Sequence, residues 1–183
     1  MALTRATPLH LRPWTGDDLP AVLDALASPD MDRQFPKRDT DEARAQAWLD
    51  WATGLTARPA GFAFAVCGED DRPVGNVAAA NVDAHDVAWV SYWTGPRGLG
   101  IAAAALAGLV PWLHDAASIA RLELGHRRNN PASGKVAERA GFLHEGAERG
   151  KLAYDGQRYD TLRWARLAGD PRAEPDRPVE IRF

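Results

Sequence analysis

Hydrophobic and polar residues alternate in some segments of the chain and recur with helical spacing in others. Alternation predicts a strand over residues 8–13, and short apolar runs bounded by turn residues predict strands over 61–68, 73–82 and 86–93. Further strands are predicted over 119–125 and, as a closing pair turned at Asp155 and Gly156, over 142–167. Helical spacing and end signals predict helices over about 17–27, 40–54, 101–116 and 130–141. Pro111 lies inside the third helix and is expected to kink or shorten it.

The order of these elements indicates the fold class. A glycine turn and a helix separate the strands at 86–93 and 119–125, which makes a parallel crossover natural between them. The pattern therefore predicts an α+β domain, or α/β with a mixed sheet, of about seven strands and about four helices.

The chain of 183 residues has the length of one domain. We assign residues 1–168 to that domain and 169–183 to a tail rich in proline and charge. The tail can end in a short strand, because Val179, Ile181 and Phe183 alternate with polar residues.

Composition narrows the class of protein. Apolar residues make up 45% and charged residues 26%, which is typical of a globular protein. No segment is apolar enough to span a membrane, and the first ten residues lack the apolar core of a signal peptide. We therefore expect a cytoplasmic protein. The single cysteine, Cys67, excludes an internal disulfide and a multi-cysteine zinc site, and we predict no metal. A net charge of −3 argues against direct nucleic-acid binding.

A glycine-rich turn stands between the predicted strand at 86–93 and the next helix. Gly95, Gly98 and Gly100 can let the backbone approach a ligand, the free amides of the helix start attract phosphate, and Arg97 adds a positive charge. The spacing matches neither the dinucleotide fingerprint nor the P-loop. A plain strand-to-helix turn explains the same glycines equally well.

A second segment, NNPASGKVAERAGF, also has two interpretations. Asn130 suits an N-cap, Pro131 suits the first helical position and Gly141 suits the helix end, so the segment reads as a well-capped helix. Asn130 and Ser133 are also polar and one turn apart, so they can instead hold a ligand.

Together, the two segments resemble the GNAT superfamily of acetyl-coenzyme A dependent acyltransferases. RGLGIA at 97–102 is similar to its R/Q-x-x-G-x-G/A signature, and N-x-x-S-x-x-V-A-E-R-A-G-F follows about 30 residues later in the manner of its second cofactor motif. Within the superfamily, the YW before the loop, the serine of NPAS and the closing YDGQRYDTLRWARL resemble the ribosomal-protein N-terminal acetyltransferases.

The resemblance implies a site for acetyl-coenzyme A (acetyl-CoA). Backbone amides would cradle the pyrophosphate, strand-end backbone would pair with the pantetheine arm and could stabilise the thioester oxyanion, and two side chains would hold the arm and the sulfur. The pyrophosphate would lie on the amides of Arg97, Gly98, Leu99, Gly100, Ile101 and Ala102. The pantetheine arm would pair with Tyr92, Trp93 and Thr94, and Asn130 and Ser133 would hold the arm and the sulfur. Ala137 occupies the position where many members carry a tyrosine general acid, so the resemblance passes that role to Ser133, to another residue or to solvent.

Activity requires a neutral amine, and therefore a proton acceptor. His126 is a candidate base because its intrinsic pKa suits the task, and Tyr154 is a further polar candidate. The acceptor is expected to be a small-molecule amine or a protein or peptide N-terminus, taken up by a monomer or homodimer. Trp48 and Trp51, three apart on a helix, fit either a core or an acceptor pocket, and Arg33 and Phe35 precede them.

The missing tyrosine at Ala137 leaves a second functional hypothesis open. The chain can also be a non-catalytic acyl-CoA-binding sensor or scaffold with the same fold.

Overall fold

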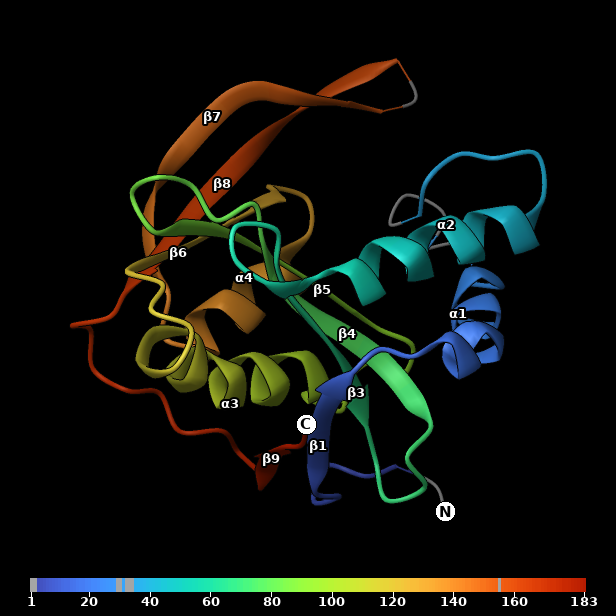
Figure 1. The fold of residues 1–183 in the computed structure, drawn as a ribbon. Coiled ribbons are helices and arrows are strands. Elements are labelled where there is room, and N and C mark those ends of the chain that lie inside the picture. Colours follow the sequence, from blue (N-terminus) through green and yellow to red (C-terminus); the bar gives the residue numbers. More distant parts are fainter. Residues whose placement is uncertain (1–2, 29–30, 32–34, 155) are drawn as a thin grey trace.

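The computed structural model describes residues 3–28, 31, 35–154 and 156–183 as one sheet with helices on both faces (Figure 1). The strands are β1 (Leu9–Pro13), β2 (Thr56–Ala57), β3 (Gly61–Cys67), β4 (Pro73–Ala80), β5 (Val87–Thr94), β6 (Arg121–Arg127), β7 (Leu143–Tyr154), β8 (Gln157–Leu167) and β9 (Val179–Ile181). The helices are α1 (Leu19–Leu26), α2 (Asp41–Gly54), α3 (Ile101–Asp115) and α4 (Pro131–Arg139), with one 3-10 turn, η1 (Gly16–Asp18), before α1.

The sheet is mixed, as the sequence predicts. Its order is β7-β8-β6-β5-β4-β3-β1-β9, with β2 added beside β3. The pairs β5–β6 and β1–β9 are parallel and the others antiparallel. Helix α3 makes the crossover from β5 to β6, so the parallel connection inferred from the glycine turn is confirmed.

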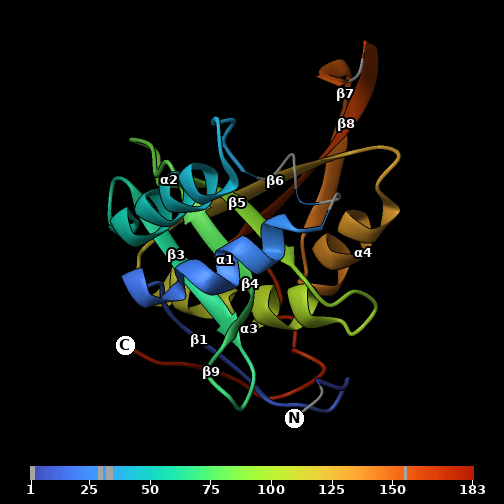
Figure 2. The same ribbon diagram turned by 90° about the vertical axis from the view of Figure 1, so that its right-hand side faces the viewer.

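Strand alternation divides the core between the two faces of the sheet. On β3, Phe64 and Val66 join the cluster built around α3 and α4, whereas Ala63, Ala65 and Cys67 join the cluster around α1 and α2. Figure 2 shows α1 and α2 covering one face. Because both faces are covered, β3 and β4 are mostly apolar rather than half polar, with Asn76 as a buried exception.

Three details differ from the sequence predictions or refine them. Pro111 does not shorten its helix: α3 continues to Asp115, since the burial of Leu113 against the core outweighs the loss of one hydrogen bond. The two-residue strand β2 was not predicted, because exposed residues carry no hydrophobic pattern. The tail does end in a strand, β9, which pairs with β1. The predicted turn residue Asp155 and the loop residue Arg33 lie outside the described residues.

A buried carboxylate ties β1 to the turn before α1. Both oxygens of Asp18 accept hydrogen bonds from the Arg12 guanidinium at 2.8 Å, and Thr15 donates its backbone amide at 2.9 Å. Burial alone raises the pKa of Asp18, but the hydrogen bonds from Arg12 and Thr15 outweigh it and hold the pKa below its ordinary value.

We therefore expect Asp18→Asn to lower the free energy of unfolding by about 2 kcal/mol at neutral pH. A lowered folded-state pKa gives stability that is fully present above the unfolded value of about 3.9 and is lost as the pH falls through the folded value. Urea titrations between pH 7 and 2.5 should show the deficit of Asp18→Asn shrinking below about pH 4. The exposed neighbour is the control: Asp17→Asn should match the parent throughout, and a deficit of Asp18→Asn that stays constant down to pH 2.5 would contradict the assignment.

Candidate active site

Strands β5 and β6 run side by side briefly and then part. Residues 87–89 of β5 pair with residues 121–123 of β6. Beyond them, β5 continues to Thr94 beside β4, while β6 continues to Arg127 beside β8. Within the described chain, the β5 edge at residues 90–94 therefore has no strand next to it. An extended arm that carries amides can pair with such an edge as an added strand.

The glycine turn lies at the end of the opening between the parted strands β5 and β6, and it carries a row of backbone donors. Gly98 and Gly100 have φ values of +77° and +74°, which are open to glycine and costly for other residues, and Gly100 is the N-cap of α3. Among the described residues, no acceptor takes a hydrogen bond from any amide of residues 98–102. Successive amides at a helix start form an anion-binding concavity, and the exposed Arg97 precedes them.

Helix α4 brings Asn130 and Ser133 to the same opening from the other side. The side-chain oxygen of Asn130 accepts a hydrogen bond from the backbone amide of Ser133 at 3.4 Å, so the capping interpretation is correct. The side-chain amide of Asn130 also donates a hydrogen bond to Ser133 Oγ at 3.0 Å. Since Oγ accepts this bond, the Ser133 hydroxyl keeps its own proton to donate elsewhere.

The hydroxyl of Tyr92 links the two sides by donating to the Ser133 carbonyl at 3.1 Å. Burial raises the pKa of Tyr92 to about 12, so this phenol stays protonated and remains a donor at neutral pH. Ala137 is fully buried, so its position points into the core rather than toward the opening. The contact of Tyr92 with α4 was not foreseen, because alternation assigns a face to a residue and not a partner.

His126 is buried and has both ring nitrogens in hydrogen bonds. Nδ1 lies 2.9 Å from the Arg127 carbonyl and donates to it, and Nε2 accepts from the Trp164 indole at 3.0 Å. To take a proton at Nε2, His126 must first break the bond to Trp164. The histidine remains a predicted base, and this geometry gives that role an energetic cost.

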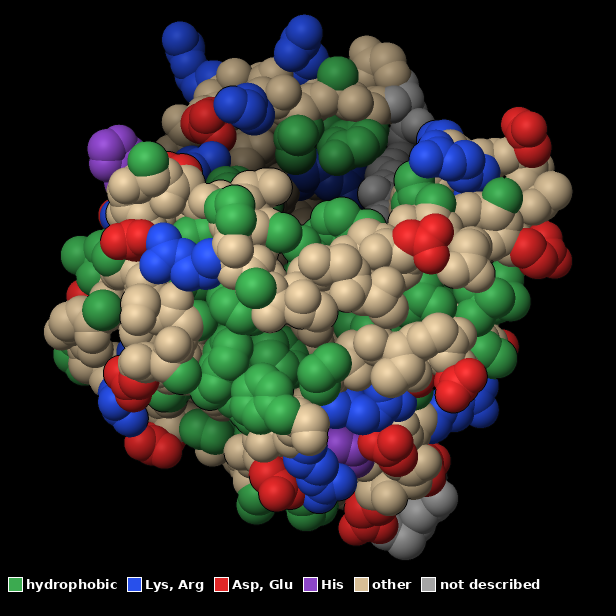
Figure 3. Space-filling view, in the orientation of Figure 1, with side chains coloured by type: hydrophobic (Ala, Val, Ile, Leu, Met, Phe, Trp, Pro, Cys, Tyr) green, Lys and Arg blue, Asp and Glu red, His purple; other side chains and the backbone are tan. Residues whose placement is uncertain are grey.

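Tyr154 lies at the end of the long hairpin β7–β8, on a different element from Ser133 and His126. The Arg127 guanidinium lies over its ring, 5.1 Å from the centroid, and over the ring of Tyr159 at 5.5 Å. The hairpin arches above the sheet (Figure 1), and the surface beneath it is hollowed (Figure 3). Tyr154 thus packs with Arg127 and Tyr159, and its catalytic role stays a prediction.

A pocket of about 330 Å³ lies between α2 and the end of β5. Its lining residues are Pro36, Arg38, Ala47, Trp48, Trp51, Asn76, Ser91, Tyr92 and Trp93. The core interpretation is correct for Trp48, which is buried, whereas Trp51 is 41% exposed at the pocket. That this pocket takes the acceptor stays a prediction. The rings of Trp48 and Trp93 meet edge to face with centroids 5.5 Å apart.

The charge that the described lining residues bring to this pocket is positive. The indole Nε1 of Trp93 is buried, and in the described part of the chain it has no hydrogen-bond partner. Arg38 adds a cation, and none of the lining residues that the structure describes carries a carboxylate. Sequence reasoning expected only the backbone of Trp93 at the site. No signal in the sequence shows that Trp93 lines a pocket together with Trp48 and Trp51.

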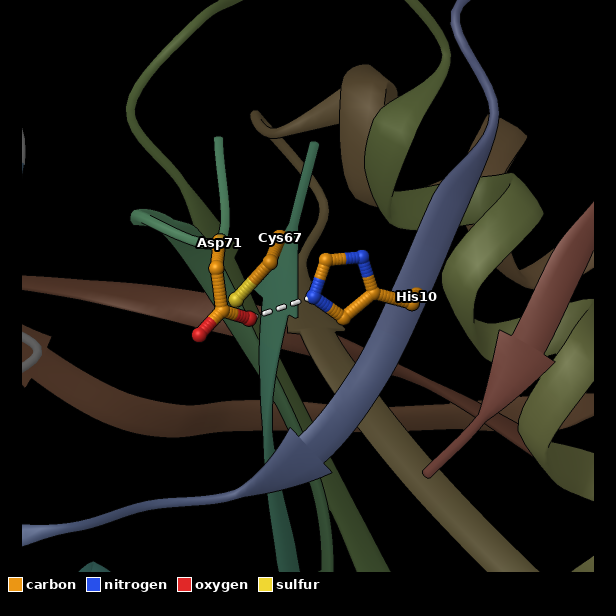
Figure 4. A group of neighbouring side chains, drawn as sticks. All are labelled: His10, Cys67 and Asp71. Atoms are coloured by element: carbon orange, nitrogen blue, oxygen red, sulfur yellow. Dashed lines mark hydrogen bonds and ion pairs between the residues drawn. The ribbon is translucent and has the colours of Figure 1, made fainter. Parts of the chain in front are cut away.

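A third group of reactive side chains lies away from the opening, at the end of β1 and β3. His10 Nε2, Cys67 Sγ and an Asp71 oxygen lie within 4.8 Å of one another (Figure 4). Asp71 Oδ1 is engaged by His10 at 2.6 Å and by Arg12 Nε at 3.0 Å. Burial raises the pKa of Cys67 to about 12, so its thiol is protonated at neutral pH and supplies no thiolate. These contacts describe a structural ion pair beside a core cysteine.

Comparison with known proteins identifies the fold. Residues 8–143 match the family model described as an acetyltransferase (GNAT) domain. No curated protein matches the sequence. Among solved structures, RimJ from Mycobacterium smegmatis, in complex with a coenzyme A disulfide, is 26% identical with a TM-score of 0.75, over 92% of this chain and 90% of that one.

Two further structures show how widely the same fold is used. Ribosomal-protein-S5-alanine acetyltransferase from Vibrio fischeri is 20% identical with a TM-score of 0.75, over 87% of this chain and 93% of that one. A spermidine N-acetyltransferase chimera of Vibrio cholerae SpeG and hSSAT is 17% identical with a TM-score of 0.72, over 88% and 96%.

The model match covers well over half of the chain, and the structural neighbours include the ribosomal-protein branch that the sequence resembles. The described residues also contain no helix that is long and apolar enough to cross a membrane. The chain thus belongs to the GNAT acetyltransferases, as an acetyl-CoA-dependent N-acetyltransferase.

Proposed function

We propose that the enzyme transfers the acetyl group directly to a primary amine bound in the pocket between α2 and β5. The pantetheine arm pairs with the free edge of β5, and the pyrophosphate lies on the amides of residues 98–102. The observation that carries this proposal is the parting of β5 from β6, since it leaves an unpaired strand edge that leads to a row of unpaired amides.

Chemistry in this arrangement needs few side chains. The neutral amine attacks the thioester carbonyl, a backbone amide of residues 92–94 stabilises the oxygen that becomes negative, and the C–S bond breaks as the tetrahedral intermediate collapses. The Ser133 hydroxyl donates a hydrogen bond to the departing thiolate, which takes up a proton from solvent as coenzyme A leaves. The amine's own proton leaves to solvent or to a base, for which His126 and Tyr154 remain the predicted candidates.

The pocket favours one class of amine. Arg38 offers hydrogen bonds and positive charge to an acceptor group, and the tryptophan rings that line the pocket offer contact to an apolar or planar group. A polyamine, which carries several positive charges, finds no carboxylate among the described lining residues. An amine next to a carbonyl or carboxylate, as in an amino acid or a peptide N-terminus, fits better.

A thiol-release assay with a panel of amines tests this function. We expect coenzyme A release with amino acids or short peptides that have apolar N-terminal residues, and release at least about tenfold slower with spermidine, because each unpaired buried charge costs more than 1 kcal/mol. A preference for spermidine would overturn the acceptor class. Binding of acetyl-CoA with no release above buffer for any amine would instead support the sensor hypothesis.

The variant Trp51→Ala tests whether the pocket holds the acceptor. We expect it to raise the KM of the best acceptor about fivefold, through loss of ring contact, and to leave the affinity for acetyl-CoA unchanged. Trp89→Ala is the matched control, because Trp89 is 37% exposed, packs against Arg163 and is not among the residues that line the pocket. An equal change of acceptor KM in both variants would show that the pocket does not hold the acceptor.

A further inference from the structure

The C-terminal tail sends one side chain under the glycine turn. The Arg177 side chain is completely buried. Its guanidinium donates to the Leu99 carbonyl in the turn, to the Thr4 carbonyl at 2.9 Å, and through Nε to Asp176 at 3.4 Å. Desolvating a buried cation is costly, and Arg177 donates its hydrogen bonds largely to backbone carbonyls far along the chain. This cost indicates that the contacts have a role at the glycine turn.

A second arginine, from the N-terminal segment, holds the neighbouring carbonyl. Arg5 donates to the Gly98 carbonyl at 3.0 Å, and the Gly100 carbonyl accepts from Ala104 at 3.0 Å in the first turn of α3. Three successive carbonyls of the turn are therefore held by the protein. In the part of the chain that is described, the amides of the same residues have no acceptor.

Peptide geometry links these two observations. In a trans peptide, the carbonyl of one residue and the amide of the next point in opposite directions within one rigid plane. Arg5 at the Gly98 carbonyl thus fixes the direction of the Leu99 amide, and Arg177 at the Leu99 carbonyl fixes that of the Gly100 amide. Both amides point away from the arginines.

The tail itself is firmly anchored, so it can act as a support. Figures 1 and 2 show it crossing from the end of β8 to β9, beside β1. β9 pairs with β1, with Val179 opposite Leu9. Val179 also lies so close to α3 that a Cβ at Gly108 would stand 2.6 Å from it. This anchorage brings Arg177 and Asp176 to the turn from a rigid element.

We propose that the tail, residues 169–183, is part of the coenzyme A site, and that Arg177 is a positioning residue which keeps the turn at 98–100 in its pyrophosphate-binding form. The inference rests on the proposed placement of the pyrophosphate. Without the hydrogen bonds from Arg5 and Arg177, a turn with two glycines has many conformations. Binding then loses the free energy that is needed to order the turn.

The test compares two ligands that differ by the pyrophosphate end. Acetyl-CoA and S-acetylpantetheine are titrated by calorimetry into the parent, Arg177→Met and the control Arg172→Met. Arg172 lies in the same tail but pairs with Asp115 on the surface at 2.7 Å. We expect Arg177→Met to raise the Kd of acetyl-CoA about tenfold and to leave that of S-acetylpantetheine unchanged, while Arg172→Met changes neither.

Each other outcome rejects a specific part of the proposal. Equal weakening of both ligands, or parent-like affinity of folded Arg177→Met for acetyl-CoA, overturns the positioning role. A parent that binds S-acetylpantetheine as tightly as acetyl-CoA overturns the pyrophosphate placement itself. If Arg177→Met does not fold, Arg5→Met replaces it, because Arg5 is exposed and its loss frees only the Gly98 carbonyl; the same ligand-selective loss is then expected, and its absence rejects the proposal.

Discussion

Gly100→Val should weaken acetyl-CoA binding about a hundredfold, the largest loss of affinity expected from a single substitution in this chain. Two charge-assisted hydrogen bonds from amides to phosphate are lost if the turn changes shape, and each contributes roughly 1.5 kcal/mol. Valine is strained at a φ of +74°, and its Cβ would stand 3.2 Å from an Asp176 oxygen. Calorimetry with acetyl-CoA measures the effect.

Gly156→Val is the matched control for this substitution. Gly156 has nearly the same φ, +75°, but lies in the hairpin turn, where a Cβ would meet no described atom within 4 Å. Both variants carry the backbone cost of a β-branched residue at positive φ, so both should melt at lower temperature. Only Gly100→Val should lose affinity. If the folded fraction of Gly100→Val binds like the parent, the glycines form a plain turn and the pyrophosphate lies elsewhere.

Ser133→Ala should lower kcat about a hundredfold, with little change in the affinity for acetyl-CoA. A hydrogen bond to sulfur strengthens only as negative charge develops in the transition state, so its loss affects turnover rather than ground-state binding. The Asn130 cap should survive, because its carbonyl oxygen bonds to the Ser133 backbone amide and not to the hydroxyl. Turnover with the best acceptor, measured at saturating acetyl-CoA, gives kcat directly.

Two further variants separate the donor role from a structural one. Ser133→Thr keeps the hydroxyl and should recover much of the rate. Asn130→Ala removes the cap, and it should mainly lower stability by about 1 kcal/mol and weaken cofactor binding. Should Ser133→Ala keep parental kcat, or raise the Kd of acetyl-CoA as strongly as it lowers kcat, Ser133 is not the thiolate donor.

The sequence alone determined those features whose signals are local. The Asn130 cap, the glycines at 98 and 100 and the crossover helix after them all depend on residues within a few positions of one another, so spacing was enough to place them. The two motifs also carried the family resemblance, which the matching family model confirms. The central strands were likewise placed by short apolar runs between turn residues, which are local signals.

Only the tertiary structure decided which groups meet across long stretches of chain. Trp164 occupies a nitrogen of His126 from 38 positions away, and Arg177 reaches the carbonyl of Leu99 from 78 positions away. The resemblance implied a role for the backbone of Trp93, but the sequence does not show that its indole Nε1 is buried without a partner among the described residues. Such contacts depend on strand order and on the path of the tail, and these are set by the packing of the whole chain rather than by the residues on either side of each group.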